Sequence, residues 1–197
     1  MQRLIFATNN QHKVDEIKSV VGNSFEILTL KEAGIDIDIE EPFDTLKENA
    51  SIKSATIHNL TKTNCFSEDT GLEIDALNGE PGVKSARYAG VDRDFKANID
   101  KVLAKLGTTE NRTARFRTVI SLILNEKEYF FEGICEGKII HTQAGIGGFG
   151  YDPIFVPSGS KKTFAEMTTA EKNEFSHRRK ATDLLLDFLS QTGKTNF

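Results

Sequence analysis

Two long strand-like runs that almost meet in the sequence constrain the fold of this 197-residue chain most strongly. The runs cover residues 114–124 and 128–136. Only Asn125, Glu126 and Lys127 separate them, and so short a polar connection is typical of an antiparallel β-hairpin. The sequence therefore predicts a pair of long neighbouring strands.

A strand followed by a helix opens the chain. Residues 3–8 form a short apolar run, which indicates a buried strand. Val14 and Ile17 then recur at helical spacing, continued by Val20 or Val21, and Gly22 is expected to end the helix. A strand–loop–helix unit combined with a hairpin predicts an α/β fold with a mixed sheet.

A capping-box pattern marks the start of another helix, because Thr45 is followed three residues later by Glu48. This helix carries Lys53 on an otherwise apolar stripe, which is unusual for a solvated lysine. The remaining predicted helices cover residues 95–106, 169–174 and 176–190.

The overall charge disfavours a protein that binds polyanions. The chain has 25 basic against 29 acidic side chains, for a net charge of −4, whereas proteins that bind extended DNA or RNA are more often basic. A small phosphate ligand is compatible with this charge, because it needs only a local basic cluster. Hydrophobic residues at 38% and charged residues at 27% are typical of a soluble globular protein.

Both cysteines lie inside apolar runs. Cys65 and Cys135 lack CxxC spacing, which disfavours a zinc ribbon and indicates two reduced thiols in the core. The apolar run near the amino terminus is too short for a signal peptide or a membrane span. We therefore expect a cytoplasmic protein.

Six polar residues join the first strand to the first helix. A helix amino terminus exposes unpaired N–H groups and a partial positive charge, so it attracts phosphate. A cation in the first turn, such as Lys13, is unfavourable there unless an anion is present. The alternative is an ordinary turn with an exposed lysine, and the glycines of a Walker A loop are missing. The six residues are Thr8, Asn9, Asn10, Gln11, His12 and Lys13.

Acidic residues are concentrated in the segment before Thr45. Isoleucine alternates with acidic residues over 35–40, which predicts a strand with Asp36, Asp38 and Glu40 on one face. A solvated acidic face is the simplest interpretation of Asp36 and Asp38.

A second acidic pair, Glu68 and Asp69, follows a predicted strand over residues 64–67. Catalytic residues favour positions where a strand leaves the core. Carboxylates that converge from two strands can hold Mg²⁺ together with phosphate oxygens and water, and one of them can act as a base toward water.

A glycine-rich loop over residues 145–150 leads into Tyr151 and Asp152. Glycine lets a backbone approach a ligand closely. Phe149 and Tyr151 could offer a stacking surface to a base, and Asp152 could accept a hydrogen bond from ring N–H groups. The alternative is a structural loop whose aromatic residues belong to the core.

Basic residues gather at the start of the last predicted helix. Lys172 precedes the run Ser176-His177-Arg178-Arg179. An arginine side chain binds phosphate or a purine carbonyl with two parallel hydrogen bonds. A solvated basic helix turn is the common alternative.

Five motifs taken together resemble the Ham1-type inosine/xanthosine triphosphate pyrophosphatase family. Their order and spacing agree with the family over almost the full length of the chain. They are T-x-N-x-x-K (Thr8, Asn10, Lys13), SEDTGL (67–72), PGVKSARY (81–88), GGFGYDP (147–153) and EKNEFSHR (171–178).

The resemblance implies one domain over residues 1–197. In this family a long curved mixed β-sheet flanked by helices forms two lobes around a central cleft, usually in a homodimer. The implied reaction is hydrolysis of noncanonical purine nucleoside triphosphates (ITP, dITP and XTP) to the monophosphate and pyrophosphate. Water attacks the α-phosphorus, Mg²⁺ is the cofactor, and the enzyme removes these nucleotides from the pool. Neither a nucleic-acid polymer nor a membrane is an implied partner.

The resemblance also implies roles for individual residues. Asp69 would accept the proton from water and contact the metal, with Glu68 beside it and either Glu40 or Glu41 as a further metal carboxylate. Lys53 would reach the triphosphate. The residues implied to bind the substrate are Thr8, Asn9, Asn10, Gln11, His12, Lys13, Lys53, Thr70, Phe149, Gly150, Tyr151, Asp152, Lys172, His177 and Arg178.

One departure from the family pattern lies in the acidic pair. Many bacterial members carry Asp-Asp where this chain has Glu68-Asp69, and the extra methylene could alter the metal geometry. Two other functions are alternatives: a Maf-type pyrophosphatase acting on pyrimidine or modified triphosphates, and a non-catalytic nucleotide sensor. A substrate panel separates the first alternative from the implied reaction, and a turnover assay separates the second.

Overall fold

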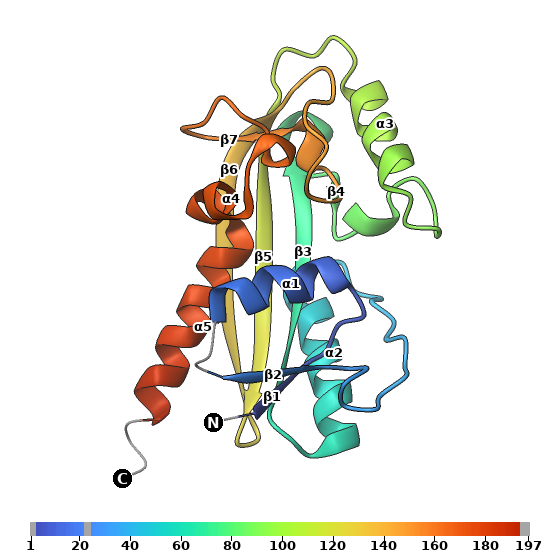
Figure 1. The fold of residues 1–197 in the computed structure, drawn as a ribbon. Helices are drawn as coiled ribbons and strands as arrows, with labels where there is room; N and C mark the ends of the chain where they lie inside the picture. The colour runs from blue at the N-terminus through green and yellow to red at the C-terminus, as the bar shows by residue number, and fades with distance from the viewer. Residues whose placement is uncertain (1–2, 22–24, 194–197) are drawn as a thin grey trace. The chain divides into compact units, whose positions relative to one another are not determined.

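A seven-stranded mixed sheet runs through the protein (Figure 1). The computed structural model describes residues 3–21 and 25–193. The strand order is β2-β1-β3-β5-β6-β7, and β4 pairs with β3. β1 is parallel to β2 and β3, whereas β3–β4 and β6–β7 are antiparallel. The strands are β1 (Arg3–Phe6), β2 (Glu26–Thr29), β3 (Cys65–Ile74), β4 (Pro81–Gly82), β5 (Thr113–Leu124), β6 (Lys127–Ile139) and β7 (Phe155–Pro157).

Five α-helices accompany these strands in the described residues, which confirms the predicted α/β class. The predicted hairpin is confirmed as β5 and β6, and Thr45 caps α2 by accepting a hydrogen bond from the Glu48 amide. Gly22, the predicted end of the first helix, lies outside the described residues. The helices are α1 (Gln11–Val21), α2 (Leu46–Thr61), α3 (Phe95–Leu106), α4 (Thr169–Phe175) and α5 (His177–Gly193). Within residues 3–21 and 25–193, no helix has the length and apolarity needed to cross a bilayer.

The chain divides into two compact units, each built from separate stretches of sequence. The first unit contains residues 1–69, 118–133 and 178–197, and the second contains 70–117 and 134–177. β3, β5 and β6 each contribute residues to both units. That these units form one domain with two lobes around a cleft stays a prediction.

In the first unit, side-chain alternation along β1 places helices on both faces of the sheet. Leu4 and Phe6 belong to a core cluster with residues of α1 and α5. Ile5 belongs to a separate cluster with Ile57 of α2. The Phe6 ring stacks on Phe66 of β3 with centroids 4.5 Å apart. Because β1 is held from both faces, the loop that follows it has a fixed starting point.

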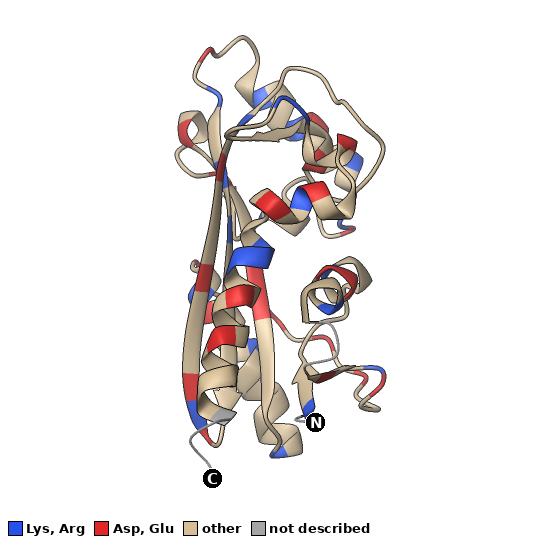
Figure 2. Ribbon diagram, turned by 60° about the vertical axis from the view of Figure 1, so that its left-hand side comes forward, with Lys and Arg blue, Asp and Glu red and all other residues tan. Residues whose placement is uncertain are grey.

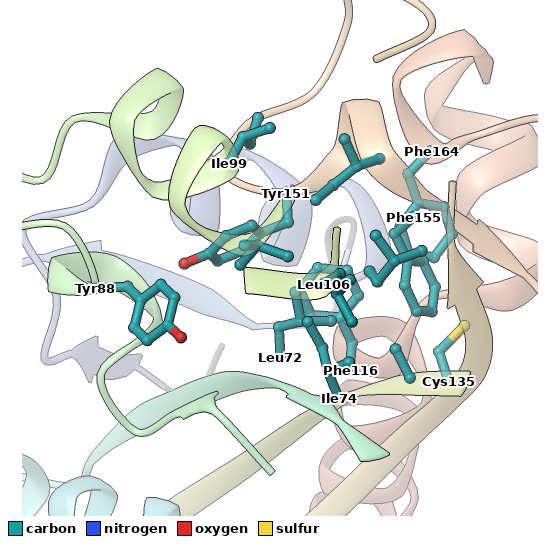
Figure 3. Close-up of a cluster of buried hydrophobic side chains, with 14 residues drawn as sticks. Leu72, Ile74, Tyr88, Ile99, Leu106, Phe116, Cys135, Tyr151, Phe155 and Phe164 are labelled. Atoms are coloured by element: carbon teal, nitrogen blue, oxygen red, sulfur yellow. The ribbon is translucent and has the colours of Figure 1, made fainter. Parts of the chain in front are cut away.

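The second unit has its own core, which is rich in aromatic side chains (Figure 3). Ile99 and Leu106 of α3 pack with Leu72 of β3 in this cluster. Phe116 and Phe155 meet edge to face, with ring centroids 4.7 Å apart. Cys135 lies in the same cluster, so the prediction of two reduced thiols in the core is confirmed for it and for Cys65.

The predicted strand over residues 35–40 is wrong. These residues are extended between elements and belong to no strand. The alternation itself is correct, since Ile35, Ile37 and Ile39 are half-buried against the α2 cluster while Asp36, Asp38 and Glu40 are exposed. Alternation reports burial on one side of an extended segment, and here the burial comes from packing rather than from a strand ladder.

The predicted end of β3 is also wrong, because the strand continues to Ile74 instead of ending before Glu68. Pairing with β1 stops at Phe6 and Phe66. Glu68 and Asp69 therefore lie inside β3, just beyond the end of its ladder with β1. The strand end predicted before Glu68 therefore corresponds to the end of the neighbouring strand, β1, and not to the end of β3.

Candidate active site

The loop after β1 is shaped by its own polar side chains. Asn10 caps the start of α1, because its side-chain Oδ1 accepts a hydrogen bond from the backbone amide of Lys13 at 3.4 Å. The backbone amide of Asn10 donates to Thr8 Oγ1 at 3.2 Å. Asn9 Nδ2 donates to the Ile37 carbonyl at 3.0 Å, which ties the loop to the extended segment. First-turn N–H groups of a helix have no partner within the helix. The start of α1 thus has the chemistry of an anion site.

Lys13 and Arg178 both bind the buried carboxylate of Glu68. Lys13 Nζ lies 2.7 Å from Glu68 Oε1, and Arg178 Nε lies 2.7 Å from Glu68 Oε2. Arg178 also pairs with Glu16 of α1. Burial by itself raises the pKa of Glu68, but Arg178 and Lys13 outweigh it and hold that pKa well below its usual range. Glu68 is therefore a carboxylate that stays ionised and fixes two cations.

The first turn of α5 explains why Arg178 needs two carboxylates. Basic residues occupy the start of α5 and acidic residues follow, as Figure 2 shows along the helix. A cation is unfavourable at a helix amino terminus because the helix dipole is positive there. Arg178 is also fully buried. The ion pairs with Glu16 and Glu68 offset the cost of burying the charge and the cost of its unfavourable place at the helix start. Sequence reasoning missed Glu16, which lies three residues after Lys13 on α1.

Lys53 links two further carboxylates in the same unit. Its Nζ pairs with Glu41 and lies 3.4 Å from Asp69 Oδ1. Burial by itself lowers the pKa of Lys53, but Asp69 and Glu41 outweigh it, so the pKa is raised and the lysine is charged. The prediction that Lys53 is not an ordinary solvated lysine is confirmed, since it is only 7% exposed.

Asp69 of β3 has one carboxylate oxygen toward Lys53 and a second that is buried. Its buried Oδ2 has no hydrogen-bond partner among the described residues. Burial raises the pKa of Asp69 above its usual value, although Lys53 and Lys13 act to lower it. An unpaired buried oxygen costs free energy. Asp69 Oδ2 is thus a place where a proton, a water molecule or a cation would be stabilised.

The cluster fits a divalent cation only in part. Within the described part of the chain, no group of three or more His, Cys, Asp or Glu side chains is arranged to hold a metal ion. Mg²⁺ commonly uses one or two carboxylates and completes its shell with phosphate oxygens and water. Glu41 and Asp69 supply two carboxylates near one another, since both contact Nζ of Lys53. Glu40 is exposed.

The second unit contains a smaller polar site around Asp152. Asp152 Oδ2 accepts from Lys172 Nζ at 2.7 Å and from the Phe149 amide at 2.9 Å. Lys172 Nζ also lies 5.2 Å from the centre of the Phe149 ring. The backbone of Gly148 approaches the same carboxylate so closely that an added Cβ would collide with Asp152 Oδ2. The glycine loop and Lys172 are therefore joined through one carboxylate.

Two residues expected at a base-binding surface are held in the core of this unit. Tyr151 is buried, and its hydroxyl donates to the Ser85 carbonyl at 2.8 Å. Burial raises the pKa of Tyr151 far above its usual value. His177 is buried with its ring stacked on Phe116 at 4.7 Å. Thr70 and Gly150 are half-buried, and substrate contacts for these four residues stay predictions.

Comparison with known protein families identifies the family of this α/β chain. The model of the Ham1 family matches residues 4–188. The chain belongs to the Ham1 family.

Named relatives cover essentially the whole chain. The dITP/XTP pyrophosphatase of Christiangramia forsetii is 48% identical over 96% of this chain and 100% of its own length. That of Porphyromonas gingivalis is 48% identical over 96% and 98%. Among solved structures, the Staphylococcus aureus Ham1 protein has a TM-score of 0.88 at 39% identity, covering 97% of this chain and 100% of its own. A HAM1 protein from Coxiella burnetii gives 0.89 at 36% identity, with coverage of 97% and 100%.

Proposed function

We propose that this protein is a nucleoside-triphosphate pyrophosphatase that hydrolyses ITP, dITP and XTP to the monophosphate and pyrophosphate. Family membership supports the proposal, since the relatives at 48% identity carry the name dITP/XTP pyrophosphatase. The observation that carries it is the buried carboxylate of Asp69, which has one oxygen toward Lys53 and the other without a partner among the described residues. The Maf-type and sensor alternatives gain no support from these comparisons.

The triphosphate is assigned to cations and amides of the first unit. Lys13 and Lys53 supply the positive charge, and the first-turn amides of α1, shaped by Thr8 and Asn10, supply N–H donors. The two lysines are now paired with Glu68 and Glu41. An ammonium group has three N–H donors, and these ion pairs use one on Lys13 and two on Lys53, so each lysine keeps at least one donor for phosphate. Asn9, Gln11 and His12 belong to the same proposed phosphate loop.

Asp69 is assigned the role of general base. Its raised pKa suits a group that must take a proton from water. The water oxygen bonds to the α-phosphorus, and the bond from that phosphorus to the α,β-bridging oxygen breaks. Pyrophosphate leaves with the electron pair of that bond, and Asp69 holds the proton.

Mg²⁺ is the proposed cofactor, with Glu41 and Asp69 as its protein ligands. When bound, a divalent cation would neutralise charge on the phosphates and stabilise the leaving pyrophosphate. Both oxygens of Glu68 are in ion pairs, so Glu68 is better suited to orienting Lys13 and Arg178 than to binding the metal. Metal contacts by Glu40 and Glu68 stay predictions.

The base is assigned to residues of the second unit. Phe149 offers an aromatic face, and Lys172 beside it suits a 6-oxo group, which ITP and XTP share. Asp152 keeps the loop and the lysine together. Tyr151, Gly150, Thr70 and His177 are proposed to line or support this region. The proposed role of Arg178 at the base must compete with its two carboxylate partners.

The setting of the enzyme is part of the same proposal. A homodimer in the cytoplasm, acting on free nucleotides rather than on nucleic acid or at a membrane, suits removal of these nucleotides from the pool. The net charge of −4 agrees with a small substrate rather than a nucleic-acid polymer.

Hydrolysis in H₂¹⁸O tests the proposed bond cleavage. Attack at the α-phosphorus puts the label in inosine monophosphate and leaves pyrophosphate unlabelled, as mass spectrometry of the products would show. Label in pyrophosphate, or release of inorganic phosphate and a diphosphate, would contradict the proposed chemistry.

A further inference from the structure

Asn49 of α2 forms an unusual pair with the backbone of Phe43. The Phe43 amide donates to Asn49 Oδ1 at 3.0 Å, and Asn49 Nδ2 donates to the Phe43 carbonyl at 3.0 Å. Asn49 is 2% exposed, so the side-chain amide that makes these contacts is buried. A side-chain amide that satisfies both backbone groups of one residue fixes that residue as a neighbouring strand would. Loss of either partner would leave a buried polar group unpaired.

Asn49 and Lys53 lie one helical turn apart on the buried face of α2. Lys53 pairs with Glu41 and Asp69. One face of a single helix therefore holds the carboxylate of Glu41 and, two residues further along the chain, the backbone of Phe43.

The connection between Glu41 and Phe43 is stiff because it is Pro42. Proline fixes its own φ near −65° and restricts the preceding residue to extended conformations. Pinning Phe43 thus limits the positions that the Glu41 backbone can take.

Burial contributes little to holding this stretch of chain. The side chains of Pro42, Phe43, Asp44 and Thr45 are exposed, and Phe43 is 41% exposed despite its size. The isoleucines that anchor the segment end at Ile39. Polar contacts tie this stretch to the buried face of α2: Lys53 pairs with Glu41, and Asn49 pairs with the backbone of Phe43.

We propose that Asn49 is a positioning residue that holds Glu41 beside Lys53 and Asp69 and thereby sets the affinity of the site for a divalent cation. This inference rests on the proposed role of Glu41 as a metal carboxylate. We assign Asn49 no direct contact with the substrate or the metal.

Hydrogen exchange at the Phe43 amide tests the geometric half of the proposal without any need for turnover. Asn49→Ala should make exchange at Phe43 at least about tenfold faster, because the amide loses its acceptor. The matched control is Asn59→Ala, on the exposed side of the same helix, which should leave the Phe43 rate unchanged. Unchanged exchange in Asn49→Ala would overturn the proposal. If that variant does not fold, Asn49→Leu carries the test, since leucine is close to asparagine in size but can neither accept from the Phe43 amide nor donate to its carbonyl.

A double-mutant cycle tests the link to the metal. The measured quantity is the affinity for Mn²⁺ in the presence of α,β-imido-ITP, followed by electron paramagnetic resonance. Asn49→Ala should weaken it roughly 10-fold, as expected for a group that orients a metal ligand. In the Glu41→Gln background the same change should have no further effect, because the residue being positioned is already lost.

The remaining outcomes separate failure of this inference from failure of the proposed function. Equal losses from Asn49→Ala in both backgrounds would mean a general structural role and would overturn the positioning proposal while keeping Glu41 as a ligand. Wild-type affinity in Glu41→Gln would overturn both the inference and the role of Glu41, and the role of Asp69 as the base would be unaffected.

Discussion

Glu68 and Asp69 are neighbours on β3 with opposite electrostatic surroundings. Two cations hold the pKa of Glu68 down, whereas burial raises the pKa of Asp69. Paired carboxylates whose pKa values are pushed apart commonly divide structural and chemical roles. The sequence predicted the importance of the pair, but not this division, because it depends on Arg178, which is 110 residues away.

Asp69→Asn should reduce turnover of ITP by at least about 100-fold, which is the lower range for loss of a general base. Asparagine keeps the size of the side chain and removes a buried charge, so we expect no loss of thermal stability at neutral pH. Asp100→Asn, at an exposed position on α3, is the control for handling and concentration. Near-normal kcat in Asp69→Asn would refute the assignment of the base.

Glu68→Gln should instead destabilise the fold, by about 3–5 kcal/mol, because it removes a carboxylate from a buried arginine. Urea unfolding measures the change. Glu26→Gln is the comparison: it breaks an exposed ion pair with Arg3, for which about 0–1 kcal/mol is expected. Equal small losses in both variants would show that the Glu68 network contributes little to stability.

The pH dependence of unfolding follows from the same two carboxylates. A lowered pKa means that Glu68 stabilises the fold above its ordinary value of 4.5, and this stabilisation is lost as the pH falls below it. Asp69 acts in the opposite sense: its raised pKa favours the fold below its ordinary value of 3.8, and that contribution is lost as the pH rises. Thermal melts should therefore show wild type losing stability more steeply than Glu68→Gln between pH 4.5 and 3.

At the scale of elements, periodicity predicted burial better than hydrogen bonding. The alternation over residues 35–40 identified which side chains face inward, yet the segment is not a strand. β3 was predicted to end before Glu68, and the residues that follow include Asp69 and Gly71, two types that are depleted in strands. Its inclusion in the sheet is decided by long-range pairing, since β4 pairs at Leu72 and Glu73. Cap patterns performed best: the start of α2 after Thr45 and both ends of α3 agree with the prediction.

A substitution in the glycine loop tests the contact between Gly148 and Asp152. Gly148→Ala should raise KM for ITP, because the new Cβ collides with Asp152 and displaces it from Lys172 and the Phe149 amide. Gly148 also has φ +71°, so the substitution carries backbone strain of about 1–2 kcal/mol. Gly79→Ala matches that strain at φ +88° without a collision, and should leave KM unchanged. An equal KM in the two variants would contradict the role of the Asp152 contact.

At the scale of the whole molecule, the α/β class and the hairpin followed from the sequence. The division into two units did not, because each unit combines distant stretches of chain and the three long strands belong to both. The proposed phosphate and metal residues come from the first unit, and the proposed base residues come mainly from the second. Local patterns identify such residues one by one, whereas their partners, such as Glu16 and Asn49, emerge only from the packed structure.

Pyrophosphate release from ITP, XTP, GTP, ATP, dTTP and UTP, each with Mg²⁺ and with EDTA, tests the proposed activity most directly. We predict rapid release from ITP and XTP with Mg²⁺, little from the other four, and none with EDTA. A preference for dTTP or UTP would contradict the purine assignment. Binding of ITP without turnover would contradict the claim that the protein is an enzyme.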